Sequence, residues 1–202
     1  TVGHGLNAAP DLIIIKNRDD GGTYWVTYCS ALGGTKALAL NLTDSVLTNS
    51  LPFNNTDPTS SVFTIGAGGP YSYSNNQNGE DHVAYCFANV PGYQRIGSYT
   101  GTGAAGPVIV TGFKPRFLII KQTDGANGWF MWDSERDSTN PNDALFSANA
   151  SNAEQSQSNH SINFLNNGFE LDDSNGAFNG SGNSYIYLAI GDDEIGSDED
   201  CL

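Results

Sequence analysis

The chain contains one segment twice, and this duplication constrains the fold more than any other feature of the sequence. GLNAAPDLIIIKNRDDGGTYWVTY, which begins at Gly5, aligns with GFKPRFLIIKQTDGANGWFMW, which begins at Gly112. Matched residues keep a nearly constant separation, so small insertions and deletions fall in the loops between them. The matched positions are Pro10 with Pro115, Lys16 with Lys121, Trp25 with Trp129, Ala37 with Ala144, Phe63 with Phe169 and Val83 with Ile186.

The duplication predicts a division of the chain into two tandem homologous units. We expect a first β repeat at residues 1–99, a Gly-rich connector at 100–106 and a second β repeat at 107–191. The remaining residues, 192–202, form a strongly acidic tail, which is typical of a solvated segment.

Each unit is predicted to be all-β. Short apolar, β-branched or aromatic runs alternate with clusters of Gly, Pro, Asn and Asp, which favours a β-sandwich or jelly-roll-like unit. The runs around 13–15 and 118–120 are unbroken, as in central strands that are covered on both faces, so we expect them in the core. Trp25 and Trp129 match between the copies within apolar strands, and we expect them in the core as well.

The glycines at the middle of the chain have the spacing of a dinucleotide-binding turn. Gly101, Gly103 and Gly106 spell G-x-G-x-x-G. A phosphate cradle, however, requires a helix to begin at the turn, because the free N–H groups of the helix bind the pyrophosphate. Pro107 and the β-branched run at 108–110 follow instead, so this segment is predicted to be a hinge between the two units.

The charge of the chain and the length of its apolar runs exclude several classes of partner. The chain carries 22 acidic and 8 basic residues, a formal net charge of −14, whereas nucleic acids and anionic membranes bind clustered Lys and Arg. No apolar run has membrane-spanning length, so no membrane insertion is expected.

Cys29, Cys86 and Cys201 form no C-x-x-C motif. Buried free thiols are expected at Cys29 and Cys86, and a disulfide between them is the alternative.

The order of the segments in the second copy resembles a known repeat. The second copy contains GFKPRFLIIKQ, WFMWDSER, DALFSANASNAEQ, INFLNNGFEL and GNSYIYLAI in succession. This frame resembles a repeat of bacteriophage tail-fibre and other virion proteins, especially those of marine phages and cyanophages. The resemblance implies an exposed virion appendage, outside the cell, that assembles with other virion subunits and forms a homo-oligomer, commonly a trimer. It implies no catalytic residues.

Aromatic and polar loops are the candidate ligand-binding segments, because loops on a rigid scaffold carry most binding residues. The copies diverge in the Gly66–Asp81 loop, which contains Tyr71 and Tyr73 among Gly, Ser and Asn, and in the Asp133–Asn142 loop. Trp132 precedes the second of these loops. It is either a core residue or an exposed platform for a sugar ring.

Two carboxylates raise the alternative of a glycan-cleaving enzyme. Asp133 and Glu135 in WDSER share one face if this segment is a strand, and could act as acid and base. The adjacent Arg136 and Asp137 make a surface ion-pair cluster an equal alternative. Weak calcium binding at acidic loops such as LDDSNG is an alternative to the absence of any cofactor, although the other ligand positions of an EF-hand are missing.

The sequence therefore predicts a non-enzymatic virion appendage module that contributes to recognition of a host-surface glycan or protein. The alternatives are a glycan-cleaving virion hydrolase, and an extracellular bacterial adhesin or filament subunit built on the same repeat.

Overall fold

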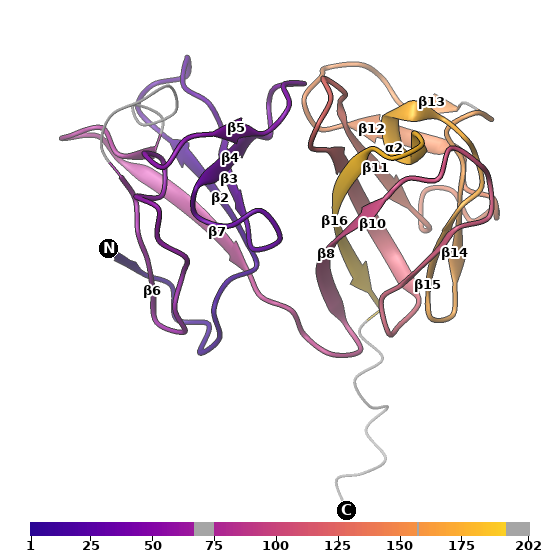
Figure 1. Ribbon diagram of the computed structural model, residues 1–202, viewed down its shortest axis with the longest axis horizontal. Helices are drawn as coiled ribbons and strands as arrows, with labels where there is room; N and C mark the ends of the chain where they lie inside the picture. Colours follow the sequence, from indigo (N-terminus) through magenta and orange to yellow (C-terminus); the bar gives the residue numbers. More distant parts are fainter. Residues whose placement is uncertain (67–74, 157, 193–202) are drawn as a thin grey trace, which may run out of the picture.

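The computed structural model describes residues 1–66, 75–156 and 158–192. The regular secondary structure is almost entirely antiparallel β-strand, and the strands form two groups side by side (Figure 1). The described segments include one short helix, α2 at Gly176–Asn179, and no helix long and apolar enough to cross a membrane. The all-β prediction is confirmed.

The first group is built on a five-stranded sheet with the order β5-β4-β3-β2-β7. The isoleucine-rich strand β2 is central and pairs with β3 on one side and β7 on the other. A short pair, β1 with β6, lies outside this sheet. The strands are β1 (Val2–Gly3), β2 (Leu12–Asn17), β3 (Val26–Cys29), β4 (Lys36–Ala39), β5 (Leu47–Thr48), β6 (Val62–Phe63) and β7 (His82–Phe87).

The second group is built on a six-stranded sheet with the order β13-β12-β11-β10-β16-β8, and a three-stranded sheet β14-β15-β9 covers it. The apolar strand β10 pairs with β11 and β16. The strands are β8 (Gln94–Thr100), β9 (Val108–Val110), β10 (Pro115–Gln122), β11 (Trp129–Asp133), β12 (Ala144–Ser147), β13 (Gln155–Ser156), β14 (Ile162–Leu165), β15 (Gly168–Leu171) and β16 (Ser184–Gly191).

The two large sheets share one strand order. The succession β5-β4-β3-β2-β7 corresponds to β13-β12-β11-β10-β16, and β8 is an additional strand at the edge of the second sheet. Local contacts recur as well. Asn41 Oδ1 accepts a hydrogen bond from the N–H of Trp25 at 2.9 Å, and Asn149 Oδ1 accepts one from the N–H of Trp129 at 2.7 Å. Two homologous units require this agreement, and their common origin stays a prediction.

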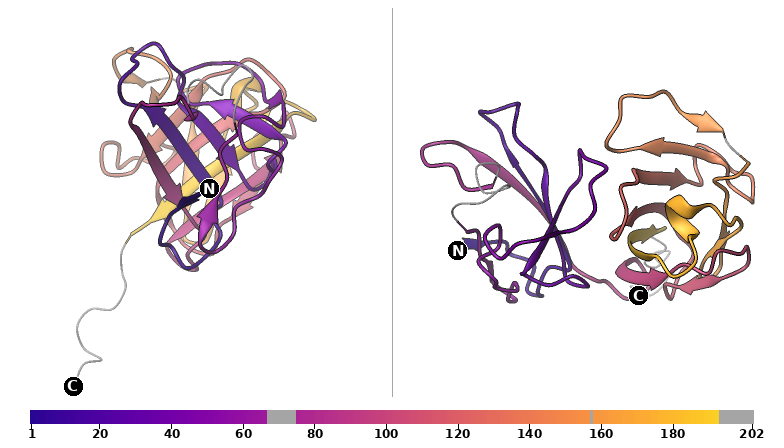
Figure 2. Two further views of the ribbon diagram at one scale, coloured as in Figure 1. Left: turned by 90° about the vertical axis from the view of Figure 1, so that its left-hand side faces the viewer. Right: turned by 45° about the horizontal axis from the view of Figure 1, so that its top comes forward.

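Three apolar layers hold the molecule together. One lies within the first group and includes Ile13, Tyr28 and Phe63, and another lies within the second group between its two sheets. The third layer joins residues of both groups, for example Leu12 with Leu188, so the two large sheets pack against each other. Figure 2 shows the groups side by side in the right-hand view, and one in front of the other in the left-hand view.

The layers explain the alternating burial of the central strands. Ile13 and Ile120 are fully buried inside their own groups. Ile14 and Ile119 point to the opposite face, where they are partly buried against the layer between the groups. The apolar runs are covered on both faces, as predicted, and the cover on the second face is the other group.

The boundary between the groups lies earlier in the chain than the sequence predicted. β8 pairs with β16 along its whole length, so residues 94–99 belong to the second sheet rather than to the first repeat. The segment that joins the groups is 88–93, between β7 and β8 (Figure 1). Asp192 is the only residue of the predicted acidic tail within the described residues.

The Gly-rich segment 101–106 is not the hinge that we expected. Gly101 N–H donates to the carbonyl of Asn183 at 2.9 Å, and Gly103 N–H donates to that of Asn179 at 2.8 Å. The segment is therefore bound to the second group. A strand, β9, follows it instead of a helix, so the geometry of a phosphate cradle is absent from this described segment.

The two described cysteines are free. Cys29 is buried and Cys86 is partly buried, and the structure contains no bond between them. Burial raises the pKa of the Cys29 thiol to about 11 and also raises that of Cys86. Both thiols therefore stay protonated at neutral pH, in the form that reacts poorly. Cys201 lies outside the described residues.

Candidate ligand groove

Trp132 is a core residue, so its alternative role as an exposed sugar platform is wrong. Its side chain is fully buried and packs edge-to-face against Phe178 of α2, with 5.5 Å between the ring centroids. The indole Nε1 donates to the carbonyl of His160 at 2.9 Å. β11 alternates its side chains, and this position faces the inner layer of the second group. Tyr71 and Tyr73 lie outside the described residues.

Asp133 and Glu135 lie at the surface in separate ion pairs. Asp133 ends β11, and its Oδ2 is 3.6 Å from Arg136 Nε. The Oε1 atom of Glu135 is 3.1 Å from Arg116 Nη1, and 66 % of the Glu135 side chain is exposed. A general acid requires a sheltered carboxyl whose pKa is raised. This geometry favours the ion-pair interpretation of WDSER over an acid–base pair.

Glu135 does, however, line a groove. A hollow of about 540 Å³ lies where four segments meet: the joining segment 88–93, the beginning of β10, the loop after β11 and the end of β16. We call it the Arg116 groove. Its lining residues are Gly92, Phe113, Lys114, Arg116, Ser134, Glu135, Ser138 and Asp192.

Arg116 lies between two carboxylates of this groove. Its guanidinium is 3.1 Å from Glu135 and 3.0 Å from Asp192, and the three side chains are 44 to 66 % exposed. Exposed ion pairs of this kind contribute only about 0–1 kcal/mol. A ligand can therefore exchange with them at little cost, and the guanidinium supplies donors beside carboxylate acceptors.

One aromatic residue lines the groove. It is Phe113, and the ring is mostly buried. Gly191 makes room for the ring, since a Cβ atom at this position would lie 2.7 Å from Phe113 Cδ2. The other lining side chains are polar or charged, so the groove is mainly polar and contains one aromatic ring. Such a surface suits a ligand with both a ring face and hydroxyl groups.

The loop after β11, in which the copies diverge, forms one wall. It runs from 134 to 143, whereas its counterpart between β3 and β4 runs only from 30 to 35. Asp137 organises the longer loop by accepting hydrogen bonds from the N–H groups of Thr139, Asp143 and Ala144. Burial alone would raise the pKa of Asp137, but these hydrogen bonds outweigh it and lower the pKa, so the carboxylate stays charged.

A comparison with models of protein families finds one match. Residues 1–193 match the model of one family, which is described as Domain of unknown function (DUF7483). The chain belongs to this family. The DUF7483 match covers both groups of strands in one range. No curated protein and no solved structure matches this DUF7483 chain.

Sequence reasoning missed Arg116, the central residue of the groove in this DUF7483 domain. Arg116 follows the matched Pro115, and the residue that follows the matched Pro10 is Asp11. In the first group Asp11 accepts hydrogen bonds from Ser30 and from the backbone of Asn89. A reversal of charge between two matched positions was the signal that could have identified this site.

Metal binding requires several ligand side chains that lie close together. Within the described ranges, no three His, Cys, Asp or Glu side chains gather as ligands of a metal ion. In the LDDSNG loop, Asp172 accepts a 3.4 Å hydrogen bond from the hydroxyl of Ser161. Weak calcium binding stays a prediction.

Proposed function

We propose that this DUF7483 chain is a non-enzymatic module of an exposed virion appendage, such as a tail fibre, that takes part in recognition of a host-surface glycan or protein. One observation supports this role most. Two sheets of the same strand order pack face to face through a shared apolar layer, which includes Leu12, Trp129 and Leu188. A stiff pair of units with loops at its ends suits a part that must transmit position and present a binding surface.

The Arg116 groove is the proposed recognition surface. Arg116 and Lys114 bring two positive charges, and Glu135 and Asp192 bring two negative ones, so the groove is locally balanced although the chain is strongly acidic. A neutral, hydroxyl-rich glycan fits this balance, because hydroxyls both donate to carboxylates and accept from a guanidinium. The ion pairs at Asp133 and Glu135 support binding rather than hydrolysis.

The expected partners follow from the family resemblance. They are other virion subunits, in a homo-oligomer that we propose to be a trimer, and a receptor on the host surface. Nucleic acid is not a proposed partner, because 22 acidic residues against 8 basic ones repel a polyanion.

The placement on a particle can be tested directly. Virions from a host culture that expresses this chain are purified on a density gradient, analysed by mass spectrometry and labelled with antibodies raised against the chain. We expect peptides of the chain in the virion fraction and gold particles at the tail or its fibres. Peptides found only in cell-surface filaments would overturn the virion assignment in favour of an adhesin or filament subunit.

A further inference from the structure

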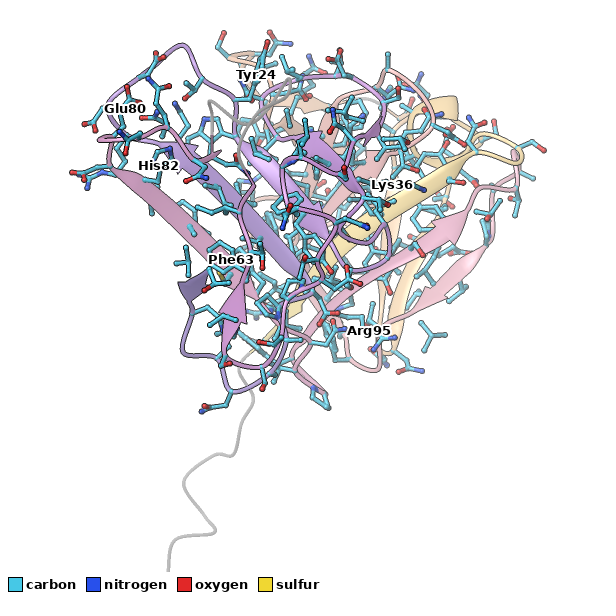
Figure 3. All side chains as sticks on the ribbon, turned by 60° about the vertical axis from the view of Figure 1, so that its left-hand side comes forward. Tyr24, Lys36, Phe63, Glu80, His82 and Arg95 are labelled. Carbon is cyan, nitrogen blue, oxygen red and sulfur yellow. The ribbon has the colours of Figure 1, made fainter. Side chains whose placement is uncertain are left out.

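Among the strands that the structure describes, β7 is an edge strand of the first sheet. In the second sheet, β8 pairs with the corresponding strand β16 through a register from Ser184 opposite Thr100 to Ile190 opposite Gln94. Among the described residues no strand pairs with the outer edge of β7, whose neighbour on the other side is β2. Figure 3 shows β7 at the margin of its sheet, with His82 at its beginning.

The free backbone groups of β7 are in phase with those that bind β8. The N–H of Thr123 donates to Ser184, which turns the backbone of Tyr187 away from β10 and toward Gly97 of β8. In the first sheet, the N–H of Arg18 donates to Asp81, and the same alternation turns the backbone of Ala84 away from β2. Ala84 thus occupies the place of Tyr187, and its N–H and C=O point to the open edge.

Side-chain exposure reflects the missing strand. Leu188 is 7 % exposed, because β8 and the layer between the groups cover it, with Ile96 of β8 opposite in the register. Its counterpart on β7 is Tyr85, which is 46 % exposed and stacks against Trp25, with 6.5 Å between the ring centroids. An added strand would cover the exposed part of Tyr85 as β8 covers Leu188.

We propose that the edge of β7 is a docking site for an extended, antiparallel segment of the β8 type, that is, for the connector strand of another unit of this family. Such a segment adds a sixth strand to the first sheet, and its backbone bonds to His82, Ala84 and Cys86. Its apolar side chains, placed as Ile96 is placed in β8, pack beside Tyr85. Open edges with unpaired N–H and C=O groups are the usual acceptors in strand addition.

One residue of β8 distinguishes the two edges. A Cβ atom at Gly97 would lie 2.7 Å from the hydroxyl of Tyr187, so the edge of β16 requires glycine at this position. On β7 the corresponding residue is the small Ala84, which leaves room for a side chain. A peptide with valine at this place can therefore bind β7 while it is excluded from the position of the resident β8, and valine also favours the extended conformation.

The test uses the isotope-labelled full chain and a synthetic peptide of residues 92–102, GYQRIGSYTGT, carrying the substitution Gly97→Val. We expect slower hydrogen exchange of the Ala84 and Cys86 amides when the peptide is added, and no change at the Tyr187 amide. The matched control peptide carries Gly97→Pro, which removes the donor that faces Ala84. It should bind about tenfold more weakly or not at all, because a ladder hydrogen bond is lost.

A variant of the protein completes the test. Ala84→Pro removes the outward N–H of β7 while the bonds to β2 remain, so the chain should keep its Tm and lose the peptide. Unchanged exchange at β7 with saturating peptide, or equal binding by the Ala84→Pro variant, would overturn the proposal. Protection of β7 without peptide that rises with protein concentration would show that a second copy of the chain, paired edge to edge, is the occupant instead.

Discussion

The indole nitrogen of Trp129 donates a 3.0 Å hydrogen bond to the carbonyl oxygen of Ala39, across the boundary between the two groups of strands. Trp129 is only 3 % exposed, whereas its matched residue Trp25 is partly exposed and stacks on Tyr85. The two tryptophans occupy equivalent backbone positions. Trp129 forms a hydrogen bond between the two groups, whereas Trp25 remains partly exposed beside the first sheet.

This difference predicts unequal costs for the same substitution. Trp129→Phe removes the hydrogen bond and leaves the Ala39 carbonyl buried without its partner, so the free energy of unfolding should fall by about 1–3 kcal/mol. Trp25→Phe serves as the matched control and should cost less, because Trp25 is partly exposed and its ring contact with Tyr85 can be kept by phenylalanine. Urea denaturation followed by circular dichroism measures both. Equal losses in the two variants would show that Trp129 does not join the groups.

The central strands should show a similar gradient of stability. Ile120→Ala leaves a cavity in a fully buried site and should cost about 2–5 kcal/mol. Ile119→Ala, on the partly buried opposite face, should cost less, because the layer between the groups can close over the gap. The same denaturation experiment compares the two variants, and a larger loss for Ile119→Ala would place the main core between the groups.

A buried lysine makes stability depend on pH. Lys121 Nζ donates to the carbonyls of Thr43 at 3.0 Å and Asn127 at 2.8 Å, and burial lowers its pKa to about 8, although Asp44 and Asp124 partly oppose this shift. The ordinary pKa of lysine in an unfolded chain is about 10.4. Between these values the unfolded chain binds more protons, so this group stabilises the fold increasingly as the pH rises.

The comparison with Lys121→Met isolates that contribution. Between pH 7 and pH 10 the stability difference should move in favour of the wild type by roughly 1–3 kcal/mol. Titration of the buried tyrosines acts equally on both proteins and cancels in the difference. A difference that stays constant over this range would contradict the depressed pKa of Lys121.

The glycine-rich segment should prove structural. Asn179 is fully buried, and its Nδ2 donates to the carbonyls of Ala104 and Asp173 at 2.8 and 2.7 Å, while its Oδ1 accepts from the N–H of Thr102. Asn179→Ala removes the partner of the Thr102 N–H and of the Asp173 carbonyl and should cost about 2–4 kcal/mol, whereas the Ala104 carbonyl still accepts from the Thr102 hydroxyl. Thermal melting measures the loss. A rise in Tm of the wild type on addition of millimolar NAD or ATP would restore the nucleotide-site hypothesis.

The repeat predicted the central strands well, because burial in the core dictates which residues of a strand are apolar. The alternation of apolar runs and turns located β2, β3, β10 and β11. Of the matched pairs, Lys16 with Lys121, Ala37 with Ala144 and Val83 with Ile186 lie in strands that occupy the same place in the two large sheets. The burial of Trp132 could also have been predicted from the alignment of the two copies. Tyr28 faces Ile13 as Trp132 faces Leu118, so the two aromatic residues are equivalent, and the spacing from Trp25 and Trp129 is the same.

Other features depend on contacts between distant segments, which a local pattern does not contain. An apolar run covered on both faces does not indicate that the second cover is the other group. The run QRIGSYT reads as a strand, but its pairing with β16 joins two segments that lie far apart in the sequence. The Arg116 groove likewise combines Gly92, Glu135 and Asp192 from three separate segments.

The proposed recognition role is tested most directly by mixing the purified chain with polysaccharide extracted from the host surface, and measuring both binding and the release of reducing ends. We expect binding without release of reducing ends. Arg116→Ala should weaken it by about tenfold or more at an unchanged Tm, since a hydrogen bond to a charged group is lost. The exposed Arg18→Ala control should bind as the wild type does. Accumulating reducing ends, or binding that is indifferent to Arg116→Ala, would contradict recognition at this groove.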